Sequence, residues 1–172
     1  MKELVTERLH LRHFKNEDAE AMFLNWASDP EVTKYVTWNT HPNVEVTKSI
    51  VNLWVSEYEN PDTVRFAITV KNTGELIGSI DIVHIVNGVP EIGYCLSRKH
   101  WNKGYMTEAC TAMIDYLFEL GYKELFIEAM VDNIGSNRVI QKCGFVFTGI
   151  KELDVTDTGK GIVKVNCYKK TR

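Results

Sequence analysis

The sequence predicts a single domain of mixed α/β architecture, built around a central and largely antiparallel sheet. The length of 172 residues fits one domain with one hydrophobic core. Three strand-like segments follow one another between residues 65 and 96 with short turns between them, which is typical of an antiparallel meander. After residue 105, helical and strand-like patterns alternate, and neither a linker nor a repeat divides the chain. We therefore expect one domain over residues 1–172.

The N-terminal part of the chain carries one strand pattern and two helix patterns. Leu9 and Leu11 alternate with polar residues, which predicts an opening strand. A first helix is expected to begin at Asn16, a suitable N-cap, and to end before Pro30. The segment 44–58 repeats its apolar positions every three or four residues, so a second helix is expected there.

The rest of the chain predicts the remaining strands and helices. Strands are expected at 65–70, 76–86, 90–96 and 124–130, with a closing hairpin over 145–155 and 162–168. Helices are expected at 105–120, which ends before Gly121, and at 136–142, which ends before Gly144. The total is seven strands and about four helices.

Composition excludes several broad classes of protein. The formal net charge is −3, so the chain lacks the basic excess of a typical nucleic-acid binder, and we expect no nucleic-acid partner. No apolar stretch approaches a membrane span, and the N-terminal residues lack the apolar region of a secretory signal. The four cysteines are scattered without metal-ligand spacing, which indicates buried thiols, no metal site and a reducing, cytoplasmic location.

The most informative segment of the sequence is EIGYCLSRKHWNKGYMTEA, residues 91–109. A strand pattern there passes through a basic loop, with Arg98, Lys99 and Lys103, and turns at Gly104 into a helix. The first turn of a helix offers unpaired backbone N–H groups and the positive end of the helix dipole, which together bind anions. The segment therefore indicates a phosphate site, although an ordinary loop with solvated cations has the same composition. It matches neither the P-loop nor GxGxxG.

Three stretches, one of them within this segment, resemble the GCN5-related N-acetyltransferase (GNAT) superfamily, in the right order and over nearly the whole chain. HWNKGYMTEA is similar to the hWgkGyatEA segment of the RimJ/RimL-like branch, which contains the ribosomal-protein alanine N-acetyltransferases. DNIGSNRVIQKCGFVFTG resembles the NxxSxxvxxKxGFxxxG motif of that branch, and TERLHLRHFKNEDAEAM resembles its TeRLxLRxxxxxDaxxm opening. By this resemblance the chain is identified as a member of the superfamily.

The resemblance implies a GNAT fold that binds acetyl-CoA as a co-substrate, without a metal. The sheet would be splayed between its fourth and fifth strands, over 91–96 and 124–130, with acetyl-CoA between them. A backbone N–H near Cys95 or Leu96 would hold the thioester carbonyl. The residues implied to bind the co-substrate are Cys95, Leu96, Arg98, Trp101, Asn102, Lys103, Gly104, Tyr105, Met106, Thr107, Asn133, Ser136 and Arg138.

Two residues of the loop depart from the family pattern. Asn102 replaces a common glycine, which matters if the backbone there has a positive φ. Met106 replaces a small residue, and its side chain would crowd a phosphate unless it points into the helix packing.

The reaction implied by the resemblance is direct attack of an uncharged amine on the thioester carbonyl. It needs a base for the amine and a proton donor for the leaving thiolate. Glu91 is the expected catalytic base, with Asp81, Asp154 or a water as alternatives. Ser136 is the expected catalytic acid, because Ile140 replaces the tyrosine that many members place in the following helix. A helix N-cap is the alternative role for Ser136.

The sequence leaves the acceptor open. Members of this branch act on protein N-termini, those of ribosomal proteins in particular, and others act on small amines or antibiotics. Tyr35, Trp38, Trp54 and Tyr58 are expected either to wall the acceptor pocket or to belong to the core. A CoA-binding module without turnover and a different acyl donor, such as succinyl-CoA, remain alternatives at this point. The chain could act as a monomer or as a homodimer.

Overall fold

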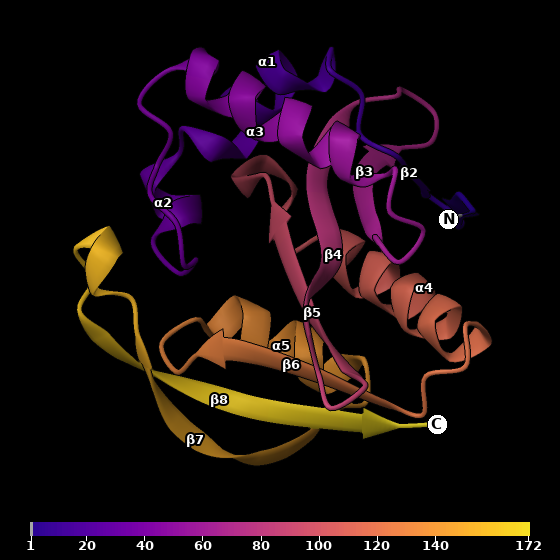
Figure 1. Ribbon diagram of the computed structural model, residues 1–172, viewed down its shortest axis with the longest axis vertical. Coiled ribbons are helices and arrows are strands. Elements are labelled where there is room, and N and C mark those ends of the chain that lie inside the picture. Colours follow the sequence, from indigo (N-terminus) through magenta and orange to yellow (C-terminus); the bar gives the residue numbers. More distant parts are fainter. Residues whose placement is uncertain (1) are drawn as a thin grey trace.

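The computed structural model describes residues 2–172, which form one twisted sheet flanked by helices (Figure 1). Within these residues eight strands lie in the order β1-β2-β3-β4-β5-β6-β8-β7. Neighbouring strands are antiparallel except β5 and β6, which are parallel. The mostly antiparallel sheet predicted from the sequence is confirmed. The strands are β1 (Leu4–Val5), β2 (Leu9–Arg12), β3 (Arg65–Val70), β4 (Leu76–Val86), β5 (Val89–Leu96), β6 (Glu124–Met130), β7 (Val146–Asp154) and β8 (Ile162–Thr171).

Five α-helices flank the sheet in the same part of the chain. None of the helices in residues 2–172 is long and apolar enough to cross a membrane. The α-helices are α1 (Asp18–Met22), α2 (Pro30–Thr33), α3 (Val44–Glu57), α4 (Tyr105–Glu119) and α5 (Ile134–Lys142). A π-helix, η1 (Phe23–Ala27), continues α1, and two 3₁₀ turns are η2 (Arg98–His100) and η3 (Thr156–Thr158).

Two elements, β1 and α2, are additions to the predicted set. With two residues, β1 is too short to carry a periodic pattern. The second addition begins at Pro30, where the missing N–H of proline costs nothing because the first helical residues have no intrahelical acceptor. The side chain of Asp29 caps this helix by accepting a hydrogen bond from the Glu31 N–H at 3.0 Å. Pro30 thus ends one helical segment and begins another.

The expected N-cap at Asn16 is wrong. The first helix begins at Asp18, and Glu17 precedes it without a side-chain cap. Asp18 instead accepts a hydrogen bond from the Lys15 N–H at 2.8 Å and pairs with Arg12 at 2.7 Å. The N–H groups of Asp18 and Ala19, which a cap at position 16 would satisfy, donate to the backbone carbonyls of Lys15 and Asn16, so the side chain of Asn16 is not needed there.

The sheet is splayed between β5 and β6, as the resemblance implies. These two strands pair through only two positions, Glu91 with Phe126 and Ile92 with Ile127. Beyond them β5 continues to Leu96 and β6 to Met130, and the two strands diverge (Figure 1). The pairs β4–β5 and β6–β8 on either side run along most of their length. The sheet therefore consists of two continuous halves joined by a short parallel contact.

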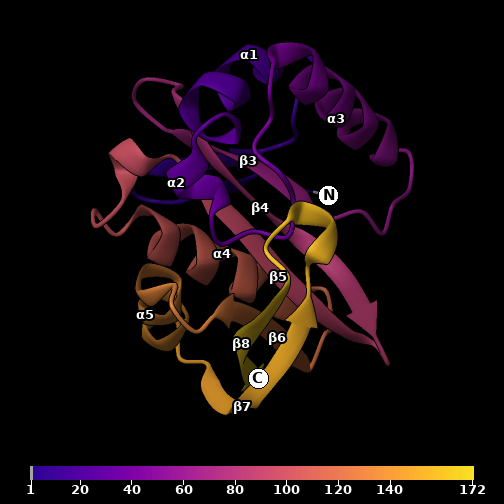
Figure 2. The same cartoon turned by 90° about the vertical axis from the view of Figure 1, so that its left-hand side faces the viewer.

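Separate hydrophobic clusters stabilise the two faces of the sheet. The larger cluster buries α4 against β2 to β6, with Met113 and Leu117 fully covered. A second cluster packs α1, η1 and α3 on the other face around Trp26 and Val51, both 0% exposed. Figure 2 shows α4 and α5 together on one side of the sheet, with α1 and α3 above. Only the larger cluster includes residues from both halves of the sheet, such as Ile92 on β5 and Ile127 on β6. Its packing keeps the halves in place although little backbone pairing joins them.

Glu108, in the first turn of α4, ties this helix to the N-terminal segment. Its carboxylate accepts hydrogen bonds from the hydroxyl of Thr6 at 2.6 Å, the N–H of Arg8 at 2.8 Å and the Arg8 guanidinium at 2.7 Å. Burial alone would raise the pKa of Glu108, but the bonds from Thr6 and Arg8 outweigh it and lower the pKa. The start of α4 is thereby fixed next to β2.

Replacing Glu108 by alanine should destabilise the fold by about 1–3 kcal/mol, because three donors lose one charged acceptor. Urea unfolding measures this loss. The matched control is Glu119→Ala on the same helix, whose exposed pair with Lys2 should contribute less than about 1 kcal/mol. The lowered pKa of Glu108 means that its contribution is complete above about pH 4.3, the ordinary value, and is lost as the pH falls through the folded-state pKa. Equal losses in both variants would contradict this role.

Candidate active site

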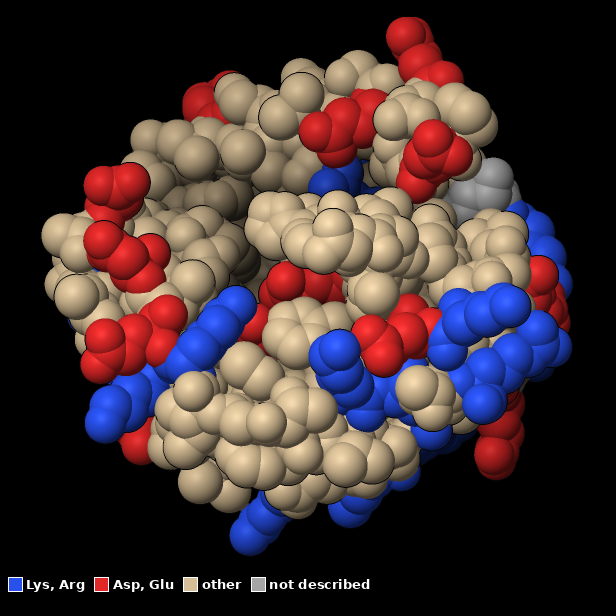
Figure 3. Space-filling model, turned by 60° about the horizontal axis from the view of Figure 1, so that its bottom comes forward, with Lys and Arg blue, Asp and Glu red and all other residues tan. Residues whose placement is uncertain are grey.

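A cavity of about 860 Å³ fills the gap between β5 and β6 and continues to the start of α4. Its size is typical of a small-molecule site. Figure 3 shows a hollow on this face with acidic side chains inside it and basic side chains beside it. The residues predicted from the sequence that line the cavity are Glu91, Cys95, Leu96, Trp101, Asn102, Gly104, Tyr105, Met106, Thr107, Asn133, Ser136 and Arg138.

The start of α4 forms an anion-binding cradle at one end of the cavity. Gly104 is its N-cap with φ 79°, and the helix leaves the N–H groups of Tyr105, Met106 and Thr107 without intrahelical acceptors. Asn102 also has a positive φ, 59°, which asparagine tolerates better than other side chains. Met106 is 4% exposed and its side chain packs in the core, so it does not crowd the cradle.

The cations beside the cradle differ from the expected set. Arg98 turns away to form an ion pair with Asp29 at 2.9 Å, and Lys103 does not line the cavity. Arg138 lines the cavity as expected, and Lys142 on the same helix joins it. The cationic side of the cavity is therefore formed by α5.

Asn133 and Ser136 are brought together at the start of α5. Asn133 is the N-cap, and its side chain accepts a hydrogen bond from the Ser136 N–H at 3.1 Å. The alternative role of Ser136 as N-cap is therefore wrong. Its hydroxyl lies 2.8 Å from the hydroxyl of Tyr94, and burial raises the pKa of Tyr94, so this phenol stays protonated. Tyr94 and Ser136 form a pair of hydroxyls at the cavity.

The ladder between β4 and β5 decides which backbone donors face the gap. The N–H of Ser97 donates to the carbonyl of Ile77 at 2.7 Å, and successive residues of an antiparallel strand direct their N–H groups to opposite sides. Cys95, in register with Ser79, therefore directs its N–H toward β4, whereas Tyr94 and Leu96 direct theirs toward the gap. Of the two donors expected for a carbonyl oxygen, Leu96 has the suitable direction and Cys95 does not.

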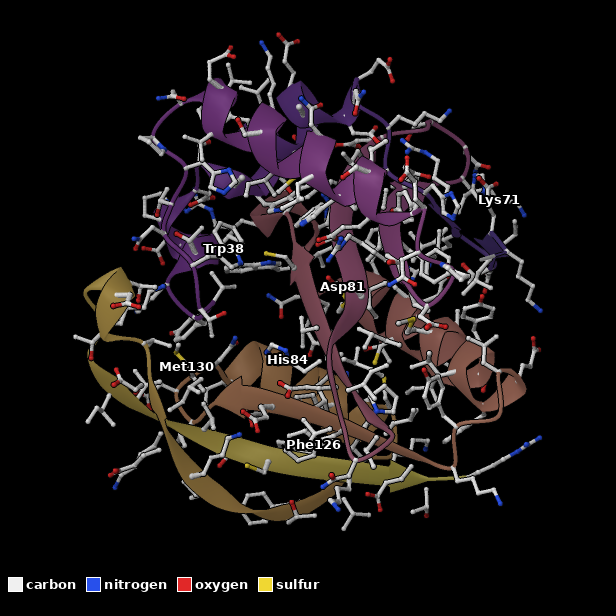
Figure 4. The ribbon with its side chains drawn as sticks, viewed as in Figure 1. Trp38, Lys71, Asp81, His84, Phe126 and Met130 are labelled. Atoms are coloured by element: carbon white, nitrogen blue, oxygen red, sulfur yellow. The ribbon has the colours of Figure 1, made fainter. Side chains whose placement is uncertain are left out.

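Four carboxylates line the cavity, three of them on one face of the sheet and the fourth, Asp132, after the end of β6. The strand registers and the alternation of side chains put Asp81, Glu91 and Glu128 on this face. In Figure 4, Asp81 on β4 and Phe126 on β6 mark the two sides of the gap. Tyr94 belongs to the opposite face of the sheet, where it reaches α5. The acidic groups and the hydroxyl pair thus flank the gap from opposite faces.

Glu91 differs from the other two carboxylates on this face of the sheet because it forms no ion pair with any of residues 2–172. Asp81 pairs with Arg65 at 3.0 Å, and Glu128 pairs with Lys151. Burial, followed by the negative charge of Glu128, raises the pKa of Glu91. A carboxylate in this state accepts a proton more readily than an ordinary one.

The two alternative bases are placed differently. Asp81 lines the cavity, but Arg65 holds it in an ion pair, and burial is the main cause of its raised pKa. Asp154 does not line the cavity. It lies at the exposed end of β7, where hydrogen bonds from the hydroxyl and N–H of Thr156 lower its pKa.

Aromatic side chains wall the cavity on the side of the carboxylates. Tyr35, Trp38 and Trp54 line it, so the first of the two roles that the sequence left open applies to them, although Trp38 and Trp54 also pack against the second hydrophobic cluster. Figure 4 shows Trp38 across the cavity from Met130 on β6. Tyr58 does not line the cavity: its hydroxyl donates to the carbonyl of Arg65 at 2.8 Å and holds the end of α3.

Sequence reasoning missed Glu128, Tyr94 and Lys142 at the cavity. The resemblance implies that the strand of Glu128 lies beside the strand of Glu91, but the register that puts the two carboxylates on the same face is visible only in the structure. Tyr94 belongs to the segment 91–109, which the sequence singles out as a phosphate site. Only its contact with Ser136 distinguishes it from a core residue. These residues act through contacts between distant segments, which local patterns do not show.

The four cysteines are free and buried, as predicted. Cys95 lines the cavity, but burial raises the pKa of its thiol to about 12, so it is not a thiolate at neutral pH. Within residues 2–172, no three of the histidine, cysteine, aspartate and glutamate side chains cluster as metal ligands.

Comparison with known proteins agrees with this geometry. Residues 8–146 match a family model described as an acetyltransferase (GNAT) domain. The chain is 35% identical over 153 residues to an uncharacterized N-acetyltransferase, p20, of Bacillus licheniformis, covering 87% of this chain and 85% of the relative. It is 37% identical over 78 residues, 44% of each protein, to a ribosomal-protein-serine acetyltransferase of Escherichia coli.

A solved structure shares the whole fold. RimL, a ribosomal L7/L12 alpha-N-protein acetyltransferase in complex with coenzyme A, superposes with a TM-score of 0.84 at 20% identity, covering 99% of this chain and 98% of that chain. The chain therefore belongs to the GNAT acetyltransferase family and is an enzyme of the N-acetyltransferase class.

Substitutions at Asn102 test the backbone of the cradle. Asn102→Val should destabilise the protein by about 1–2 kcal/mol, because a branched side chain is strained at positive φ, whereas Asn102→Gly should retain stability. Urea unfolding compares them. Lys103→Val is the control, since this exposed neighbour has no positive φ, and it should change stability by less than about 0.5 kcal/mol. Equal stability of the two valine variants would show that position 102 is not strained.

Proposed function

We propose that the protein transfers the acetyl group of acetyl-CoA to a primary amine, either a protein N-terminus, such as that of a ribosomal protein, or a small amine. One observation carries the proposal. Glu91, a carboxylate without an ion pair, and the hydroxyl pair of Tyr94 and Ser136 flank one gap from opposite faces of the sheet. A base on one side and a proton donor on the other are what direct transfer from a thioester to an amine needs.

The cavity supports acetyl-CoA as the donor. The free N–H groups at the start of α4, together with Arg138 and Lys142, suit a pyrophosphate. Apolar residues of β6, such as Ile127 and Ala129, line the gap and suit an extended pantetheine arm. The RimL structure that shares this fold was obtained with coenzyme A. The N–H of Leu96 is a suitable donor for the thioester carbonyl.

In the proposed reaction, Glu91 takes a proton from the ammonium of the acceptor, directly or through water. The neutral amine nitrogen bonds to the carbonyl carbon, and the N–H of Leu96 stabilises the oxyanion that forms. The carbon–sulfur bond then breaks, the thiolate of CoA receives a proton from the hydroxyl of Ser136, and the nitrogen, now bonded to carbon, releases its second proton to water. Tyr94, hydrogen-bonded to that hydroxyl and kept protonated, orients it and can return a proton.

Two classes of acceptor have support. The relative from Escherichia coli is named a ribosomal-protein-serine acetyltransferase, which supports a protein N-terminus. The aromatic and acidic wall of the cavity supports a small amine. Buried, unpaired cysteines fit a reducing compartment, so we place the enzyme in the cytoplasm, as a monomer or a homodimer.

Calorimetric titration tests the donor. Acetyl-CoA should bind, and succinyl-CoA should bind at least about tenfold more weakly, because its extra carboxylate would meet Asp81, Glu91 and Glu128. Adenosine 3′-phosphate 5′-diphosphate, which is CoA without its pantetheine arm and keeps the pyrophosphate, should compete for the cradle. Equal affinity for succinyl-CoA would contradict acetyl-CoA as the preferred donor, and no binding of either thioester would contradict the whole proposal.

Glu91→Gln tests the base. Acetyl transfer should fall by about 10²–10⁴ in kcat, while the dissociation constant of acetyl-CoA stays the same, because only proton removal is lost. Ser136→Ala should also lower kcat. Asp154→Asn is the control and should leave transfer unchanged, since this carboxylate lies outside the cavity. Full activity of Glu91→Gln together with loss in Asp81→Asn would assign the base to Asp81.

The pH dependence of kcat/KM gives a separate test. Activity should fall on the acid side as Glu91 is protonated, at a higher pH than an ordinary glutamate would give, because its pKa is raised. Glu128→Gln should move this acid limb to lower pH, since it removes a like charge from beside Glu91. If the acid limb of the kcat/KM profile stays in place or moves to higher pH in Glu128→Gln, Glu91 is not the group that titrates.

A further inference from the structure

The carboxylate side of the cavity is bounded by two segments that are far apart in the sequence. The segment 34–43, between α2 and α3, lies along one edge, and the hairpin of β7 and β8 lies along the other. Figures 1 and 2 both show the tip of this hairpin beside that segment. The lining residues are Tyr35, Val36, Thr37 and Trp38 from the segment, and Leu153 and Val165 from the hairpin.

One side chain joins the two segments. Lys160, next to η3 at the tip of the hairpin, donates from its ammonium to the carbonyl of Val36 at 2.7 Å and to the carbonyl of Trp38 at 3.1 Å. Partial burial lowers the pKa of Lys160. A partly buried ammonium on two backbone carbonyls is fixed in position, unlike a solvated surface lysine. We call these two hydrogen bonds the Lys160 clasp.

The segment 34–43 is anchored at its base as well. The N–H of His41 donates to the carbonyl of Ala27 at 2.9 Å, and the imidazole of His41 lies 2.7 Å from the hydroxyl of Thr47 in a buried contact. At the other end, Tyr35 packs against the cluster of Met130 on β6. With both ends held, the Lys160 clasp fixes the middle of the segment over the cavity.

We propose that the Lys160 clasp limits the size of the acceptor, so that the enzyme acetylates a compact primary amine in preference to a protein N-terminus. The inference rests on the proposed function and specifies its substrate class. The clasp bridges the segment 34–43 and the hairpin of β7 and β8, which form the two edges of the cavity. If the acceptor were a protein N-terminus, the residues after its amine would have to leave the cavity between these edges. Tyr35, Trp38 and Val165 around the carboxylates suit an amine with a small apolar body.

Acceptor kinetics test the proposal with acetyl-CoA as donor, 2-phenylethylamine as the compact amine and tetra-alanine amide as the peptide. The wild type should have at least about tenfold higher kcat/KM for the compact amine. Lys160→Ala should reduce that preference at least about tenfold by lowering the KM of the peptide, with the KM of acetyl-CoA unchanged. Lys160→Arg keeps a donor cation and should retain the preference.

Lys164→Ala is the matched control, because this exposed lysine of the same hairpin does not line the cavity. It should behave as the wild type. A wild type that prefers the peptide, or a preference that Lys160→Ala does not change, would overturn the inference while leaving the proposed function intact. Transfer to neither acceptor by the wild type would instead contradict the proposed function.

Hydrogen exchange tests the clasp without an acceptor. The amides of residues 34–43 should exchange at least about tenfold faster in Lys160→Ala than in Lys164→Ala, because the loss of two hydrogen bonds to a cation loosens the segment. Equal exchange in the two variants would overturn the inference.

Discussion

The short pairing of β5 with β6 is the constraint on which the site depends. After two register positions the strands diverge, and the N–H groups of Tyr94 and Leu96 face a gap instead of a neighbouring strand. A buried N–H without an acceptor costs about 1–3 kcal/mol, so an interrupted sheet is stable only if water or a ligand satisfies these groups. The interruption therefore creates both the cavity and the polar backbone groups that recognise an extended ligand with a carbonyl.

The rest of the structure keeps this gap open and gives its two faces different chemistry. The larger hydrophobic cluster joins the two halves of the sheet, and the hydrogen bonds of Glu108 fix the start of α4 beside them. The alternation of side chains puts Glu91 and its acidic neighbours on one face and Tyr94 on the other. An amine can then approach from one face while a thiolate is protonated at the other. The Lys160 clasp bounds the face of the carboxylates.

Much of this arrangement follows from local sequence patterns, and the remainder depends on contacts between distant segments. The helix at Gly104 and the meander strands are predictable because turn residues and periodicity are local, whereas β1 is too short for any pattern. The sequence predicts Arg98 beside the phosphates of the co-substrate, but in the structure it forms an ion pair with Asp29, which precedes α2. Glu128 and Lys160 acquire their roles only through the register of β6 and the position of a hairpin, which no single segment encodes.

Residue-resolved NMR of the backbone amides with and without acetyl-CoA tests the central claim most directly. If the thioester lies in the gap, the amide signals of Tyr94 and Leu96 should shift and their hydrogen exchange should slow on binding. The amide of Cys95 lies between them, but it pairs with β4, so its exchange should be unchanged. Equal responses of these three amides, or no response while acetyl-CoA binds elsewhere, would contradict the account.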